Sequence, residues 1–110
     1  MAETFKNAAL QNVSNSSAQT LYTAPAATST IVLGAALANK TSNNITATLR
    51  FVDTSASTTT QMLSGVQIPP NTTLEVFAGQ KYVLETGDSL TVLSSASSAL
   101  DVTLAVLELS

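Results

Sequence analysis

The chain has 110 residues, of which 45% are apolar and only 10% are charged, so we expect one domain with a single core. It contains no Cys, His or Trp, which excludes disulfides, zinc–thiolate sites, iron–sulfur clusters and every catalytic scheme that needs Cys or His. Four basic residues, Lys6, Lys40, Arg50 and Lys81, are scattered among seven acidic ones. Nucleic acids and anionic membranes attract clustered basic residues, so we expect neither as a partner.

The chain begins with a segment that fits two structures. If it is extended, Phe5, Ala9 and Val13 fall on one side of a strand, and the polar stretch that follows resembles a hinge. We therefore expect residues 1–18 to form either an N-terminal arm or a first strand, and residues 19–110 to form the β-sandwich domain. No basic segment followed by an apolar stretch marks a signal peptide, so we expect synthesis in a cytoplasm.

Apolar and polar residues alternate along the rest of the chain, which is typical of strands with one buried face. Turn signals such as Pro69-Pro70 and Thr86-Gly87-Asp88 separate these runs. The sequence predicts about eight strands, over residues 5–13, 19–23, 29–38, 45–53, 61–68, 73–78, 80–85 with 89–94, and 100–109. Short strands at this spacing predict an all-β fold, an antiparallel β-sandwich that is either immunoglobulin-like or a jelly roll.

The apolar side of the alternating pattern predicts the core. The residues that we expect there are Ile31, Leu33, Leu49, Phe51, Val92, Val102 and Leu104. Phe77 and Tyr82 also lie in predicted strands and are expected in the core, whereas Tyr22 is ambiguous. Leu107 and Leu109 place apolar side chains on the second face of the last strand, so we expect its end to be covered on both sides.

The acidic residues offer little chemistry. Glu85 and Asp88 are close in sequence, but a glycosidase needs two carboxylates in a cleft, and Asp in a Thr-Gly-Asp turn is a common turn residue. The acidic residues weighed as calcium ligands are Asp53, Glu75, Glu85, Asp88 and Asp101. They do not cluster in the spacing that calcium loops use. We therefore predict no catalytic residue, no metal site and no cofactor.

Three segments carry a resemblance to a known class of proteins. They are Leu21-Tyr22-Thr23-Ala24-Pro25-Ala26, Ile68-Pro69-Pro70-Asn71-Thr72-Thr73-Leu74 and Leu84-Glu85-Thr86-Gly87-Asp88. In this order they resemble small virion structural proteins of tailed bacteriophages, particularly marine ones, over roughly residues 20–109. The resemblance implies a β-sandwich on the virion, in the head decoration, neck or tail, with no enzymatic activity and no cofactor.

We therefore expect a non-enzymatic capsid decoration (cement) protein. It would bind the major capsid protein or other virion proteins as a homo-oligomer, with a trimer favoured. The contact residues that we expect are Phe5, Ala9, Leu10, Val13, Tyr22, Pro69 and Pro70. A neck, tail or fibre-associated component is the first alternative, and a carbohydrate-binding module for a host receptor is the second. An exposed aromatic beside acidic or amide groups in a groove would favour the carbohydrate module, and a flat apolar patch would favour decoration.

Overall fold

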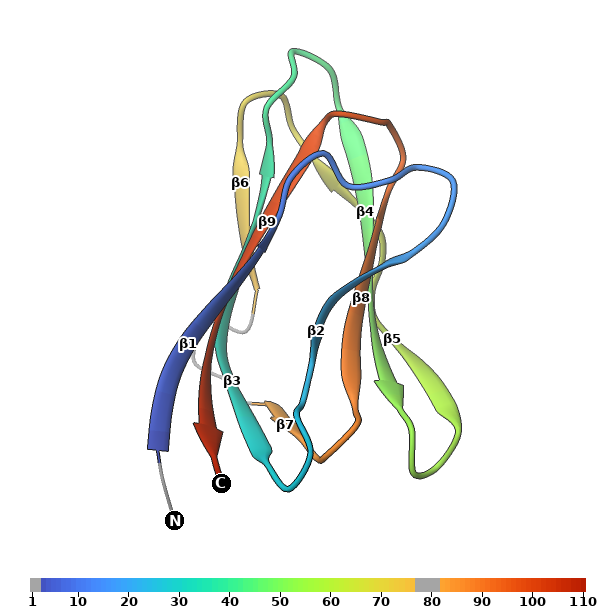
Figure 1. Cartoon of the computed structure of the whole chain (residues 1–110). Coiled ribbons are helices and arrows are strands. Elements are labelled where there is room, and N and C mark those ends of the chain that lie inside the picture. The colour runs from blue at the N-terminus through green and yellow to red at the C-terminus, as the bar shows by residue number, and fades with distance from the viewer. Residues whose placement is uncertain (1–2, 77–81) are drawn as a thin grey trace.

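The computed structural model describes residues 3–76 and 82–110, and over these residues the chain is all-β, without a helix. The described strands are β1 (Glu3–Leu10), β2 (Gln19–Thr23), β3 (Ser29–Asn39), β4 (Ile45–Asp53), β5 (Thr58–Ile68), β6 (Thr73–Val76), β7 (Tyr82–Leu84), β8 (Ser89–Ser94) and β9 (Leu100–Leu109). They form two antiparallel sheets that face each other (Figure 1). No membrane-spanning helix occurs among these residues. The predicted antiparallel β-sandwich is confirmed.

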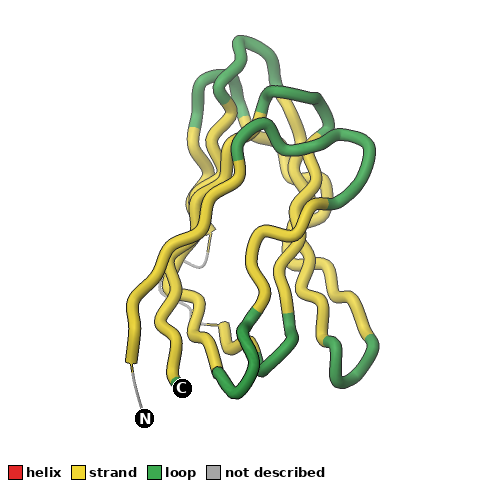
Figure 2. The backbone as a smooth tube through the Cα atoms, viewed as in Figure 1, coloured by secondary structure: helices red, strands yellow, loops and turns green. Residues whose placement is uncertain are grey.

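The strand order identifies the type of sandwich. A five-stranded sheet has the order β1-β9-β3-β6, with β7 also paired to β3, and a four-stranded sheet has the order β2-β8-β4-β5. β6 and β7 pair with successive parts of β3 and so share the place of one strand. Apart from this pair and the β4–β5 hairpin, every connection crosses from one sheet to the other, and the loops gather at the two ends (Figure 2). This is the order of a jelly roll, one of the two types that the sequence allowed.

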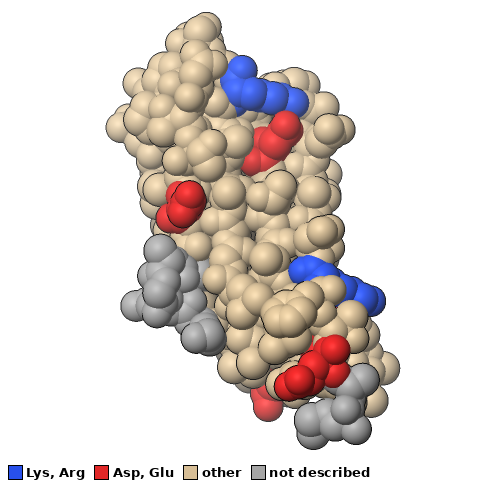
Figure 3. Space-filling model, turned by 90° about the vertical axis from the view of Figure 1, so that its left-hand side faces the viewer, with Lys and Arg blue, Asp and Glu red and all other residues tan. Residues whose placement is uncertain are grey.

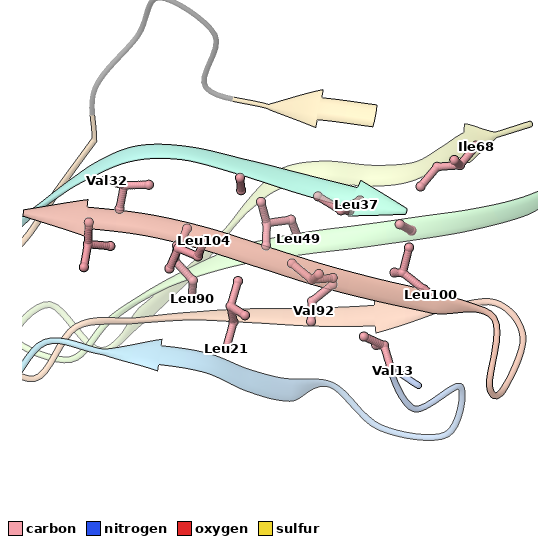
Figure 4. Packing of buried hydrophobic residues seen from close by; sticks show 14 of the residues in the cluster. Val13, Leu21, Val32, Leu37, Leu49, Ile68, Leu90, Val92, Leu100 and Leu104 are labelled. Carbon is pink, nitrogen blue, oxygen red and sulfur yellow. The ribbon is translucent and has the colours of Figure 1, made fainter. Parts of the chain in front are cut away.

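The core lies between the two sheets and is built from the inward-facing residues of both (Figure 4). Leu49, Val92, Val102 and Leu104 are buried there, as the alternating pattern predicts. Phe51 is only partly buried at the margin of this cluster. The predicted strands over 73–78 and 80–85 extend onto residues 77–81, which with Phe77 lie outside the described residues.

The prediction that Ile31 and Leu33 belong to the core is wrong, because β3 contains a β-bulge. Val32 pairs with Val106 of β9 and Gly34 pairs with the next residue, Ala105, so Leu33 is an extra residue in β3. An extra residue reverses the alternation of faces. Val32 before the bulge and Leu37 after it are therefore fully buried, while Leu33 is 36% exposed. Tyr82, also expected in the core, is 41% exposed.

The N-terminal segment lies along the same sandwich. β1 pairs with β9 in an unbroken register, from Glu3 opposite Leu109 to Leu10 opposite Val102. Beyond β1, Val13 has no exposed surface, and its backbone amide donates a hydrogen bond to the carbonyl oxygen of Leu100. Residues 11–18 thus close one end of the core between the two sheets.

Candidate interaction surface

A row of apolar side chains crosses the outer face of the five-stranded sheet. Phe5, Leu107, Ile31 and Val83 are direct cross-strand neighbours in this order, from β1 through β9 and β3 to β7. Phe5 is 76% exposed and Val83 is 58% exposed, while the two residues between them are half-buried. We call these four residues the apolar row. A contiguous apolar patch that water can reach is typical of surfaces that contact another protein.

A shallow hollow of about 430 Å³ lies beside the apolar row on the same face. Its apolar lining includes Leu33, Gly34, Ala36 and Ala105, and the exposed acidic residue Glu75 of β6 lines its margin. The surface is low here because these side chains are mostly small, and a Cβ atom added at Gly34 would meet nothing within 4 Å. Asn7 also lines the hollow, but no described lining residue is aromatic.

Charged side chains avoid the centre of this face. In Figure 3 the blue and red residues lie toward its ends and margins, and the middle of the view is uncharged. Lys40 and Asp101 form an ion pair at 3.1 Å between Nζ and Oδ1. The backbone amide of Asn12 donates a hydrogen bond to the Asp101 carboxylate, which lowers the pKa of that carboxyl, and Lys40 lowers it further. The face therefore suits a neutral partner surface.

A polar cluster ties the two sheets together at one end of the core. The Tyr22 hydroxyl of β2 donates a 2.5 Å hydrogen bond to Glu108 Oε2 of β9 and lies 3.0 Å from Thr30 Oγ1 of β3. Lys6 Nζ of β1 lies 3.4 Å from the other Glu108 oxygen, Oε1. Burial and the hydrogen bond to Glu108 raise the pKa of Tyr22 to about 12, and the hydrogen bond from Tyr22 lowers the pKa of Glu108. The cluster is a structural bridge, since each group is satisfied by another.

The acidic residues considered for catalysis either stabilise turns or lie too far from one another to form a site. Asp88 is buried, and its carboxylate accepts hydrogen bonds from the backbone amides of Thr54 and Glu85. These bonds close the turn in which Gly87 has a φ of +86°, a conformation that favours glycine. Within residues 3–76 and 82–110, no group of three His, Cys, Asp or Glu side chains is placed to hold a metal ion.

The chain shares its fold with solved structural proteins. No protein-family model matches it, and no curated protein matches it in sequence. It is similar to a chain of the Cyanophage Pam1 capsid asymmetric unit, with a TM-score of 0.52 and 18% identity over 96% of this chain and 83% of that chain. It is also similar to a Bacillus endospore appendage from a family of disulfide-linked pili, with a TM-score of 0.54 and 10% identity over 96% of this chain and 85% of that chain. At these identities the likeness shows a shared fold.

The structure brings together only some of the contact residues expected from the sequence. Phe5 and Ala9 are both exposed on the outer face of β1. Leu10 points to the opposite face and is half-buried, and Val13 is completely buried in its own chain. Tyr22 is half-buried in the bridge to Glu108.

The proline turn lies far from Phe5. Pro69 and Pro70 are exposed beyond the end of β5, where the carbonyl oxygen of Pro69 accepts a hydrogen bond from Asn39 Nδ2 at the end of β3. The apolar row crosses β3 near its beginning, at Ile31. The two candidate surfaces therefore lie at opposite ends of the five-stranded sheet.

Sequence reasoning named Phe5 as a contact residue but missed Ile31 and Val83 of the apolar row. Leu107 could be recognised from the sequence, because it is an apolar residue on the second face of the last strand. Ile31 was assigned to the wrong face because the bulge at Leu33 was not visible in the sequence. The alignment of Phe5 with Val83 depends on the strand register, which a single sequence does not contain.

Proposed function

We propose that this chain is a non-enzymatic structural protein of a virus particle, and that it decorates the capsid through the outer face of the five-stranded sheet. The observation that carries this proposal is the apolar row on a face whose centre is uncharged. Jelly-roll sandwiches are common in viral capsids. The similarity in fold to a chain of the Cyanophage Pam1 capsid asymmetric unit is consistent with the same use.

The partner that this face fits is a flat, neutral, apolar area of the capsid shell, which we assign to the major capsid protein. Burying an exposed Phe or Val side chain contributes roughly 1.5–3 kcal/mol. A decoration protein makes this contact at many equivalent positions of a particle. Its attachment therefore needs no ion pair, and we expect it to depend only weakly on salt.

The carbohydrate-binding alternative has less support. Carbohydrate readers present aromatic side chains in a groove, but the hollow beside the apolar row has no aromatic among its described lining residues. Phe5 lies instead next to Leu107 in the apolar row. By the criterion set from the sequence, this arrangement favours decoration.

The direct test is cryo-electron microscopy of particles made from the genome that encodes this chain, with mass spectrometry of their proteins. We expect density for the sandwich on the outside of the head, with the apolar row against the shell. The same map distinguishes the head from the neck or tail. The proposal is wrong if purified particles lack the chain.

A binding assay tests the face itself. Particles that lack the chain are mixed with the purified protein and sedimented. Val83→Asp puts a charge into the apolar row and should lose binding, whereas Gln61→Asp adds the same charge on exposed β5 of the other sheet and should bind like the original chain. Equal binding by both variants would contradict attachment through this face.

A further inference from the structure

The free edges of the two sheets differ in whether they can accept another strand. Four described edge strands are short or irregular. β6 has four residues and β7 has three, while the pairing of β2 contains one register shift and that of β5 contains two. Short strands and bulges are the usual means by which proteins prevent edge-to-edge pairing. β1 has neither feature. Its eight residues keep one register along β9 and contain no proline.

We propose that the free edge of β1 pairs antiparallel with β1 of a second copy of this chain. Such pairing satisfies the backbone amide and carbonyl groups that point away from β9, as in other cases of strand addition. The five-stranded sheets of the two copies then continue into one another. Two identical antiparallel strands are related by a twofold axis, so the assembly closes at two copies. This pairing makes the basic unit a dimer, in place of the trimer that we expected from the sequence.

The charges of β1 select the register. A twofold axis perpendicular to the joined sheet places outward-facing residues of one copy opposite outward-facing residues of the other. Two of the registers that this symmetry allows keep most of β1 paired. The register centred on Lys6 places two lysines directly opposite each other, which is unfavourable. The register centred on Asn7 places two neutral amides opposite each other and sets Phe5 opposite Ala9 of the second copy. We therefore assign the register centred on Asn7.

Lys6 does not block this pairing. An inward-pointing charge can protect an edge strand, but Lys6 Nζ already lies 3.4 Å from Glu108 Oε1 of its own chain. In the assigned register Lys6 faces Ala8 of the second copy, so no like charge opposes it. The one lysine of β1 thus excludes one register and leaves the other open.

The pairing also lengthens the exposed apolar surface. Phe5, the most exposed large apolar residue described, gains Ala9 of the second copy as its neighbour. The apolar rows of the two copies come to lie on the same face of the joined sheet. This proposal does not rest on the capsid role, because it concerns only the purified chain.

Sedimentation of the purified chain over a range of concentrations tests the proposal first. We expect a monomer–dimer equilibrium. Asn7→Asp places two carboxylates opposite each other at the twofold axis and should weaken the dimer about fivefold at neutral pH. Asn44→Asp adds the same charge in an exposed loop and should leave the dimer unchanged. A chain that stays monomeric or forms a trimer overturns the proposal.

Cysteine cross-linking tests the register, and the chain has no native cysteine to interfere. Directly opposed strand residues have Cα atoms about 4.5–5.5 Å apart, within the range of a disulfide. Asn7→Cys should therefore form a covalent dimer under mild oxidation. Ala9→Cys, on the same face, places its two sulfur atoms roughly 13 Å apart along the strands and should not cross-link by itself.

The double variant Phe5→Cys with Ala9→Cys should restore the cross-link, since these two positions face each other. Far-UV circular dichroism checks that each variant keeps the strand content of the original chain. Cross-linking by Ala9→Cys as efficient as by Asn7→Cys overturns the assigned register. Absence of any cross-link in Asn7→Cys, with the fold retained, overturns the pairing.

Discussion

Leu33 and Leu104 are leucines in long strands of the same sheet, yet Leu33 is 36% exposed and Leu104 is 2% exposed. Burial, and not residue type, sets how much each contributes to stability. For a polar residue, burial matters in another way, because a buried charge needs partners. Glu108 is buried on the inner side of β9 but is matched by Tyr22 and Lys6, so its charge is tolerated at the end of the core.

Leu104→Ala should lower the free energy of unfolding by about 2–5 kcal/mol, because it leaves a cavity between the sheets. Leu33→Ala should cost about 1 kcal/mol or less, because the removed atoms are partly in water already. Urea unfolding followed by circular dichroism measures both, since the chain has no Trp to follow by fluorescence. Equal losses would contradict the assignment of the two faces of β3 and β9.

The Tyr22–Glu108 hydrogen bond should make stability depend on pH at both ends of the scale. The pKa of Glu108 is lower in the folded chain than its ordinary 4.5. Its contribution is therefore present above that value and is lost as the pH falls through the lower, folded pKa. The pKa of Tyr22 is raised to about 12, so its contribution is present below pH 10 and is lost as the pH rises from 10 toward 12.

Tyr22→Phe removes this hydrogen bond while keeping the aromatic ring. We expect the loss of stability between pH 10 and 12 to become smaller in this variant, and the loss below pH 4.5 to become smaller as well. Tyr82→Phe, which removes the hydroxyl of the other tyrosine, is the matched control. Thermal unfolding recorded at steps of pH gives both profiles, and identical profiles for Tyr22→Phe and the original chain would rule the bridge out.

At the scale of elements, the bulge in β3 is the feature that shapes the candidate surface. Simple alternation counted back from the buried Leu37 would place Ile31 inside and Val32 outside. Because Leu33 is an extra residue, Ile31 lies outside and Val32 inside. Ile31 joins the apolar row, and Leu33 lines the hollow beside it. A single inserted residue thus adds apolar side chains to the outer face while the core keeps Val32 and Leu37.

Deletion experiments test the bulge. Deleting Leu33 leaves a regular strand in which Val32, Ala35 and Leu37 still face inward, so the variant should fold and unfold cooperatively. Deleting Ala36 also leaves a regular strand with Leu37 inward, but it turns the buried Ala35 outward and puts Gly34 in its place in the core, so it should cost more stability. Circular dichroism and urea unfolding distinguish the two. The bulge is wrongly placed if the Leu33 deletion is the more damaging one.

At the scale of the whole molecule, strand pairing is almost entirely non-local. β1 pairs with β9, β2 with β8 and β3 with β9, and among the described strands only β4 and β5 pair as consecutive neighbours. The first and last strands, β1 and β9, are therefore direct neighbours in the five-stranded sheet (Figure 1). Such a topology must close long loops before most contacts form.

We expect the chain to fold in milliseconds to seconds, the range of other small all-β domains. Stopped-flow refolding from urea, followed by circular dichroism, measures this rate. Refolding in microseconds would contradict the non-local pairing.

The sequence by itself determined the class of fold. Alternation of apolar and polar residues depends only on neighbours along the chain, and it correctly placed Leu49, Val102 and Leu104 in the core of an antiparallel sandwich. The absence of Cys and His likewise excluded the chemistry that depends on them without any coordinates. Of the candidate surface, alternation identified Phe5 on one side of the first segment and a second apolar face at Leu107.

Tertiary structure alone decided the strand order, the bulge and the surface. Sheet order and register depend on which strands pair, and that choice is set by contacts between residues far apart in sequence. The bulge at Leu33 exists only relative to β9, so no local pattern could place Ile31 outside and Val32 inside. For the same reason, Phe5, Leu107, Ile31 and Val83 became one row only when four strands were aligned side by side.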